Sequence, residues 1–214
     1  MKTLLDQALP SYEFRGHVSV PVAASAAEIF QALWEVTLDD MPLARLLGTL
    51  RYLPGRVLGK APPTVARSSF LEQVLSSGNI VLAEHANREL VVGAIAKFHQ
   101  ILNQQFWPLE DAVQFRVFGD PEYQKLAMSF RVETGPRGSV LTLEHRTHAL
   151  GAASRRAFAL YWVFIKPTSH FVSWLLLRAV RRRAELAERT VCAIRTDCAA
   201  PARLHVREER RTHA

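Results

Sequence analysis

Residues 139–185 read SVLTLEHRTHALGAASRRAFALYWVFIKPTSHFVSWLLLRAVRRRAE, and they decide the fold because they combine two periodicities. Residues 139–148 alternate between apolar and polar side chains, which is typical of a half-buried strand. After Gly151, apolar side chains recur every three or four positions, which predicts a helix over residues 152–188. Pro167 lies inside this helix and is expected to kink or locally break it, because proline donates no backbone hydrogen bond.

Further strands are expected upstream of this stretch. Residues 14–22 alternate in the same way, with valines on one side. Residues 119–121 and 135–138 contain glycine and proline, as hairpin turns do, so the strands that they join should be antiparallel. Gly93 is expected to mark a bulge that bends the sheet. The predicted strands cover residues 14–22, 80–86, 89–99, 112–118, 123–134 and 139–148.

Two short helices are expected between the first strand and the later ones. Ser25 stands three residues before Glu28, which is the spacing of a capping box at a helix start. Helices collected on one side of an antiparallel sheet give an α+β domain. A long helix laid across a curved sheet can leave space for an apolar ligand. After the first helix we predict a helix over residues 42–50, a loop over 52–66 and a short helical piece over 68–75.

The composition is typical of one soluble globular domain. The chain has 214 residues, of which 49% are hydrophobic and 22% charged. Cys192 and Cys198 do not have metal-ligand spacing, and we expect both to be reduced. The N-terminal residues lack the pattern of a signal peptide. Residues 158–177 are apolar, but Lys166 near their centre argues against a membrane span. We expect a cytoplasmic protein that binds no metal and no cofactor.

The net charge of +7 is unevenly distributed. Residues 178–214 contain ten arginines and five acidic residues, whereas residues 1–177 are almost balanced. We expect this basic segment to be solvated, with weak contact to an anionic membrane as the alternative. Nucleic acid is not an expected partner, because no separate reading element accompanies the charge. The predicted organisation is an N-terminal extension over 1–11, one domain over 12–189 and a basic, disordered tail over 190–214.

The order of elements resembles the START-like, or SRPBCC, helix-grip superfamily, which includes polyketide cyclase/dehydrase and lipid-transport proteins. The stretch HVSVPVAASAAEIFQALWEV over 17–36 looks like the family's first strand and first helix, and residues 139–185 look like its last strand and closing helix. The similarity is greatest to bacterial members with a Thr-Glu-x-Arg strand followed by an Arg-x-Phe-x-x-Tyr-Trp helix. The matching residues here are Thr142, Glu144, Arg146, Arg156, Phe158, Tyr161 and Trp162.

The resemblance covers residues 12–188 and implies a curved antiparallel sheet wrapped around the C-terminal helix, with a cavity between them. The last strand departs from the Thr-Glu-Thr-Arg form of the family, because it reads Leu143-Glu144-His145-Arg146. The resemblance implies a fold and a cavity more firmly than it implies a reaction.

Four polar side chains share one face of the last predicted strand: Thr142, Glu144, Arg146 and His148. If this face is the outer one, they are solvated. If it is the concave face, Glu144 and Arg146 are buried charges that need partners. A buried Glu–Arg pair is either structural or able to orient a polar ligand group and move protons.

We interpret the chain as a carrier or sensor that binds a small hydrophobic molecule or lipid between the sheet and the C-terminal helix. One alternative is a cyclase/dehydrase-type enzyme acting on a polyketide-like substrate, with Glu144 as the candidate catalytic residue. A second is a lipid carrier that meets anionic membranes through residues 178–183 and the tail. The residues expected to line the cavity are Glu144, Arg146, His99, Trp107, Tyr161 and Trp162.

Overall fold

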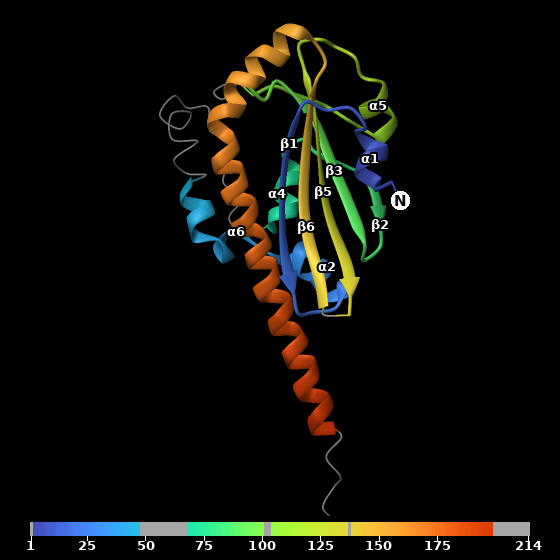
Figure 1. Cartoon of the computed structure of the whole chain (residues 1–214), viewed down its shortest axis with the longest axis vertical. Coiled ribbons are helices and arrows are strands. Elements are labelled where there is room, and N and C mark those ends of the chain that lie inside the picture. Colours follow the sequence, from blue (N-terminus) through green and yellow to red (C-terminus); the bar gives the residue numbers. More distant parts are fainter. Residues whose placement is uncertain (1, 48–67, 101–103, 137, 199–214) are drawn as a thin grey trace, which may run out of the picture.

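The structure is a computed structural model that describes residues 2–47, 68–100, 104–136 and 138–198 (Figure 1). A curved antiparallel sheet lies against one long helix, so the predicted α+β class with a helix-grip arrangement is confirmed. The strands follow the order β1-β6-β5-β3-β2, and β4 pairs with β3. They are β1 (Phe14–Val22), β2 (Ile80–His85), β3 (Glu89–Ala96), β4 (Phe106–Trp107), β5 (Gln124–Gly135) and β6 (Gly138–Ala149). The helices are α1 (Leu4–Ala8), α2 (Ala26–Glu35), a 3-10 turn (Leu38–Asp40), α4 (Phe70–Ser76), α5 (Ala112–Val117) and α6 (Ala152–Cys198).

Both faces of the sheet are covered. Leu141 and Leu143 of β6 point to the inner face, where they pack in one hydrophobic cluster with side chains of α2, α4 and α6. The intervening Thr142 and Glu144 point to the outer face. That face carries a second cluster, to which α1 contributes Leu5 and Leu9 and α5 contributes Phe115. Residues 4–9 of the segment expected to be an N-terminal extension therefore pack on the domain.

The first helix of the inner layer forms as its sequence predicts. The Ser25 hydroxyl accepts a hydrogen bond from the Glu28 backbone N–H, and the Glu28 carboxylate accepts one from the Ser25 N–H, so the capping box is confirmed. Ile29 and Leu33 are at most 1% exposed. Burying each such side chain contributes roughly 1.5–3 kcal/mol, which fixes α2 against the sheet and α6.

The long helix is not broken at Pro167 and extends beyond its predicted end. It runs without interruption through Pro167, and Figure 1 shows that it bends in its first part. A proline in a helix interior costs about 3 kcal/mol, and burial of Phe158 before it and Leu176 after it offsets that cost. The helix also continues to Cys198, so residues 190–198 of the expected disordered tail are helical. Residues 199–214 lie outside the described residues.

One predicted strand is wrong. Residues 112–118 were expected to be extended, but 112–117 form α5. The cause is the cap, because the Asp111 carboxylate accepts hydrogen bonds from the N–H groups of Val113 and Gln114 at 2.8 and 2.7 Å. Residues 119–121 therefore join a helix to β5 and do not form a hairpin. The β5–β6 hairpin is confirmed, and Gly138 at its turn has a φ of +116°, which favours glycine.

The other predicted strands are confirmed with small shifts at their ends, except that β3 stops at Ala96 and not at residue 99. The bulge expected at Gly93 lies on the neighbouring strand, where the β2 register shifts between Val81 and Ala83. A Cβ atom at Gly93 would lie 2.5 Å from the Leu82 side chain, so the glycine makes room for the bulged residue. The helix predicted over 42–50 is described over 42–47, and the loop predicted over 52–66 lies outside the described residues.

No helix in the described part of the chain is long and apolar enough to cross a membrane.

Candidate functional site

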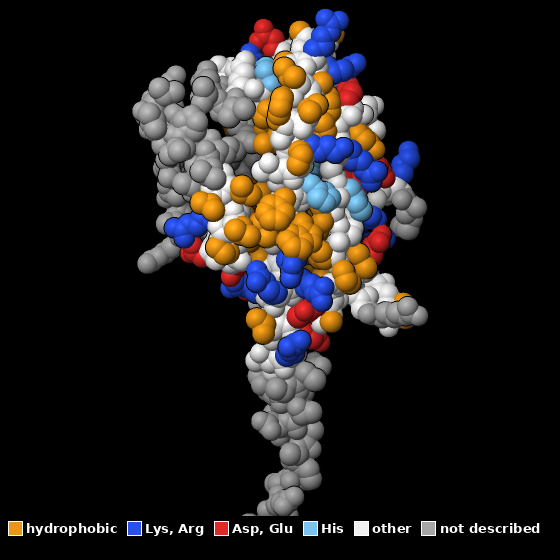
Figure 2. All heavy atoms as spheres, turned by 60° about the vertical axis from the view of Figure 1, so that its left-hand side comes forward, with side chains coloured by type: hydrophobic (Ala, Val, Ile, Leu, Met, Phe, Trp, Pro, Cys, Tyr) orange, Lys and Arg blue, Asp and Glu red, His pale blue; other side chains and the backbone are white. Residues whose placement is uncertain are grey.

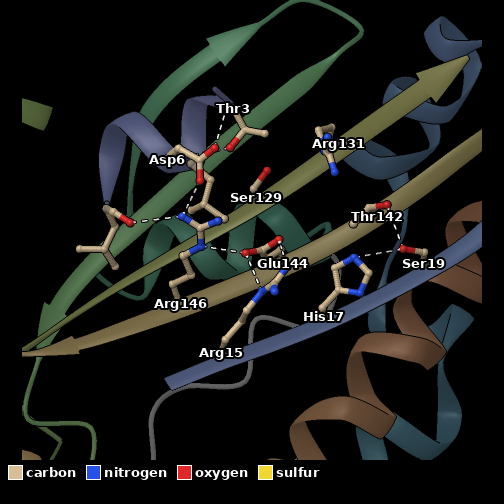
Figure 3. Close-up of polar contacts among 12 residues, drawn as sticks. Thr3, Asp6, Arg15, His17, Ser19, Ser129, Arg131, Thr142, Glu144 and Arg146 are labelled. Carbon is tan, nitrogen blue, oxygen red and sulfur yellow. Dashed lines mark hydrogen bonds and ion pairs between the residues drawn. The ribbon is translucent and has the colours of Figure 1, made fainter. Parts of the chain in front are cut away.

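Glu144 and Arg146 lie on the outer face, yet they are buried, with relative exposures of 9% and 7%. Arg15 binds the Glu144 carboxylate in a bidentate pair, through Nε and Nη2 at 2.9 Å each. Arg146 Nε binds the same carboxylate at 2.7 Å (Figure 3). Glu144 and Arg146 are therefore not solvated, and they do not lie on the concave face. They form a buried ion-pair network with Arg15 on the face away from α6.

The Arg146 guanidinium extends this network to α1. It lies 2.9 Å from Asp6 Oδ1, and it donates to the Leu9 carbonyl at the C-terminal end of the helix at 3.4 Å. It also stacks on Tyr12, with its carbon 4.5 Å from the ring centre. Arg146 therefore holds one end of α1 on the sheet.

Glu89 of β3 holds the other end of α1. Its carboxylate accepts hydrogen bonds from the N–H groups of Leu4 and Leu5 at 2.9 and 3.3 Å, and from the Ser129 hydroxyl at 2.8 Å. A carboxylate at the first turn of a helix and a cation at its last carbonyl both match the orientation of the helix dipole. Glu89 was not singled out from the sequence, because its partners Leu4 and Leu5 are more than 80 positions away and Ser129 is 40 positions away.

These contacts keep Glu144 charged. Burial alone would raise the pKa of Glu144, but the hydrogen bonds from Arg15 and Arg146 outweigh it and hold the pKa below its usual range. The pKa of Asp6 falls to about 2, chiefly because it accepts a hydrogen bond from the Thr3 backbone. A carboxylate held by two guanidinium groups is poorly suited to donate or receive protons, and Glu144 is linked to α1 through its partner Arg146.

The six residues expected to line one cavity fall in three places. Glu144 and Arg146 lie on the outer face, and Trp107 lies there too, packed on Phe118 and Tyr123 with 41% of its surface exposed. His99 lies beyond the end of β3, with Nδ1 3.3 Å from Gln124 Oε1. The two α6 aromatics, Tyr161 and Trp162, are near Phe158, with ring centroids 5.6 and 5.9 Å from it.

His145 is the titratable side chain that the structure adds to the inner face. Its ring is 5.6 Å from that of Trp162, and its Nε2 lies 3.3 Å from the Ser169 hydroxyl. Burial lowers the pKa of His145 to about 4, so the imidazole is neutral at neutral pH. A Cβ atom at Gly16 would lie 2.2 Å from His145 Nε2, so the close approach of β1 requires glycine.

The inner face is packed unevenly along β5, the central strand. Phe130 and Val132 are buried in the inner hydrophobic cluster. Leu126 and Met128 point to the same face, yet both are only partly buried. Met128 packs against the inner cluster on one side, and its partial exposure together with that of Leu126 marks incomplete packing at the edge of that cluster.

Gln124 ends this row with an unusual polar group. Its side chain is fully buried, and Oε1 accepts a hydrogen bond from the Phe98 N–H at 2.9 Å. Its Nε2 has no hydrogen-bond partner among the described residues. Buried donors are nearly always paired, so this enclosed N–H group marks an unsatisfied polar group at the end of the row. Neither Leu126, Met128 nor Gln124 was singled out from the sequence, because a partly filled face leaves no periodic signal.

Two small clefts formed by the described residues lie on the outer face, beside α1. The larger, of about 290 Å³, is lined by the 7–11 segment, Arg116, Lys125 and His148. The Lys125 ammonium donates to the Arg116 carbonyl at 2.8 Å, and burial lowers its pKa. The described residues contain no cluster of His, Cys, Asp or Glu that could hold a metal ion.

No protein-family model and no curated protein matches the chain. Among solved structures, it is similar to protein MLL2253 from Mesorhizobium loti, at 17% identity and a TM-score of 0.35 over 79% of this chain and 98% of that one. It is similar to the di-domain ARO/CYC StfQ from the steffimycin biosynthetic pathway, at 11% identity and a TM-score of 0.36, covering 81% and 51%. The aromatase/cyclase Zhui from Streptomyces sp. R1128 has 16% identity and a TM-score of 0.29, covering 80% and 93%. With all TM-scores below 0.5, these likenesses carry no argument about function, which rests on the geometry above.

Proposed function

We propose that this protein is a carrier or sensor that binds a small hydrophobic molecule or lipid on the inner face of the sheet, beside the first half of α6. The proposed site is called the Met128 region and comprises Gln124, Leu126, Met128, His145 and Trp162. The observation that carries the proposal is the partial exposure of Leu126 and Met128 in the middle of the central strand.

The chemistry of the Met128 region favours an apolar ligand with one polar group. Leu126, Met128 and the Trp162 ring offer apolar contact, and burial of ligand surface contributes about 25 cal/mol per Å². Gln124 Nε2 is unpaired among the described residues but enclosed by protein, so a carbonyl, hydroxyl or carboxylate oxygen of the ligand would reach it only after a neighbouring side chain shifts. Leaving such a buried donor unpaired costs roughly 1–3 kcal/mol, so an acceptor there adds both affinity and orientation.

The enzymatic alternative receives less support from the geometry. Its candidate acid–base residue, Glu144, faces the opposite side of the sheet and is held by Arg15 and Arg146. His145 is the ionisable side chain within the Met128 region, and a single neutral imidazole does not supply the acid–base pair that a cyclisation with dehydration requires. Binding is therefore the function that we propose.

The test is native mass spectrometry of freshly purified full-length protein, followed by organic extraction of what it carries. We expect a discrete extra mass that disappears on denaturation. Met128→Trp should fill the region and remove this mass. Val117→Trp is the matched control, because Val117 is 76% exposed on α5 at the outer side, and it should keep the mass.

A second arm uses a fluorescent fatty acid as probe, so that loss of the natural ligand during purification does not decide the outcome. We expect the wild type and Val117→Trp to bind the probe and Met128→Trp to bind it at least tenfold more weakly, in line with blocking of a binding pocket. Equal binding by all three proteins would place any ligand elsewhere. A wild-type protein that has no extra mass and binds no probe would contradict the proposal.

A further inference from the structure

The first half of α6 carries apolar side chains on two opposite sides. One side packs on β1, β6 and α2, with Phe158 and Leu176 buried. The opposite side, which we call the α6 stripe, keeps its apolar side chains exposed, although an apolar helix face is normally buried. The stripe consists of Leu160 (67% exposed), Val163 (68%), Phe164 (74%), Pro167 and Phe171 (40%), with Trp174 at its end.

The spacing of these residues makes the stripe continuous. Positions 160, 164, 167, 171 and 174 follow the alternating steps of three and four that keep side chains on one helix face. Figure 2 shows apolar side chains running along this face and ending at a group of basic side chains. Contiguous exposed apolar surface of this kind marks an interaction site.

The charged residues around the α6 stripe indicate which kind of partner binds it. From Ala152 to Ala184, α6 contains seven arginines and lysines and no acidic residue. Arg156 precedes the stripe on the same face and Lys166 flanks it, both exposed, and Arg178 closes it with its guanidinium 4.6 Å from the Trp174 ring centre. An apolar helix face whose own helix supplies flanking cations and no acidic residue is the pattern of helices that lie in the interface of an anionic bilayer.

We propose that the α6 stripe docks the protein on the surface of an anionic lipid bilayer, with α6 lying in the plane of the interface. Leu160, Val163, Phe164 and Phe171 enter the boundary between headgroups and acyl chains. Arg156, Lys166 and Arg178 bind lipid phosphate and carboxylate groups. Because the stripe faces away from the sheet, this docking does not depend on the ligand proposed for the Met128 region.

The experiment is co-sedimentation of the full chain with vesicles of phosphatidylcholine, with and without phosphatidylserine, at low and high salt. We expect binding to the phosphatidylserine vesicles, weakened by salt. The double variant Leu160→Ser/Phe164→Ser should reduce binding on the order of tenfold or more, because two inserted side chains are lost. The matched control is Val113→Ser/Val117→Ser, which removes two exposed apolar side chains from α5 and should bind as the wild type does.

The charge contribution is tested by Arg156→Gln/Lys166→Gln, with Arg88→Gln/Arg116→Gln as the control away from α6. The first pair should reduce binding on the order of tenfold and flatten its salt dependence, and the second should not. Circular dichroism confirms that each variant is folded, and native mass spectrometry follows the ligand separately. No binding to anionic vesicles, or equal loss in the α5 control, would overturn the proposal. So would a wild-type dimer that Leu160→Ser/Phe164→Ser dissociates, because the stripe would then belong to a second copy of the chain.

Discussion

The two faces of the sheet differ in how completely their polar and apolar groups are satisfied. On the outer face, the charges of Glu89, Glu144 and Arg146 are buried, and each is paired with α1 or with a neighbouring strand. On the inner face, His145 is the buried ionisable side chain among the described residues, Met128 is partly exposed, and Gln124 Nε2 has no hydrogen-bond partner within the described part of the chain. The buried charges of the outer face are thus explained by partners within the protein. The incomplete packing around Met128 on the inner face is the better guide to a ligand.

The largest expected effect is on the outer face. Glu144→Leu removes the common partner of Arg15 and Arg146, and it should lower the free energy of unfolding by about 3 kcal/mol or more, because two guanidinium groups lose their shared carboxylate. Urea unfolding measures this loss. Glu133→Leu is the control, because Glu133 is 60% exposed and should change stability by less than about 1 kcal/mol.

Hydrogen exchange locates the effect of Glu144→Leu. The amides of α1 should lose protection, while binding of the fluorescent fatty acid remains at the wild-type level. Loss of ligand binding with α1 still protected would make Glu144 part of the binding site, and the contrast between the two faces would fail.

The next effect is a dependence of stability on pH that originates on the inner face. The pKa of His145 is about 4 in the folded protein and 6.5 as a reference value, so the unfolded chain takes up the proton first as pH falls. The free energy of unfolding is therefore unaffected by protonation of His145 above pH 6.5. Between pH 6.5 and about pH 4 it falls progressively, by about 3 kcal/mol in all. The difference in unfolding free energy between wild type and His145→Asn should show this slope, and a constant difference across the interval would disprove it.

A smaller effect is expected at the contact between β1 and His145. Gly16→Ala places a Cβ atom against the imidazole and should destabilise the protein by about 1–3 kcal/mol. The double variant Gly16→Ala/His145→Ala should be less destabilised than the sum of the single variants, because the smaller side chain removes the clash. Additive losses would mean that the two positions do not share this contact.

The smallest effect has the opposite sign. Lys125 is 7% exposed, and its ammonium has one described hydrogen-bond acceptor, the Arg116 carbonyl. Lys125→Met should stabilise the protein by about 1 kcal/mol at neutral pH, because burial disfavours the charge. The gain should shrink as pH rises toward 10.5, where the unfolded lysine also becomes neutral. Destabilisation by Lys125→Met would indicate that the cleft beside α1 stabilises the ammonium.

Much of the fold could be predicted from local patterns. The alternation of residues 14–22, the Ser25–Glu28 capping box and the β5–β6 hairpin each correspond to the element that forms. Residues 112–117 also alternate, but the cap at Asp111 makes them helical. The five-residue α1 is too short for a periodic signal, and its stability comes from contacts with Glu89 and Arg146 that no local pattern contains.

The candidate site could not be predicted in the same way. Both faces of β6 are buried, so alternation separated Glu144 from Leu143 without showing which one faces α6. The Met128 region is recognised by incomplete packing of Leu126 and Met128 in three dimensions. No sequence pattern shows how completely side chains pack against one another. Of the predicted lining, Trp162 belongs to the proposed site, and His99 lies beside it, with Nδ1 3.3 Å from Gln124 Oε1.

The most direct measurement is methyl NMR of the protein with labelled methionines, before and after removal of the bound ligand. Met41 is 2% exposed in the filled part of the inner core, whereas Met128 is partly exposed, so the two methyl groups compare packed and unpacked regions of one face. We predict that ligand removal and addition of the fluorescent fatty acid shift the Met128 signal and leave Met41 unchanged. If the fluorescent fatty acid binds and the Met128 signal stays unchanged, the proposal that the inner face holds the ligand is contradicted.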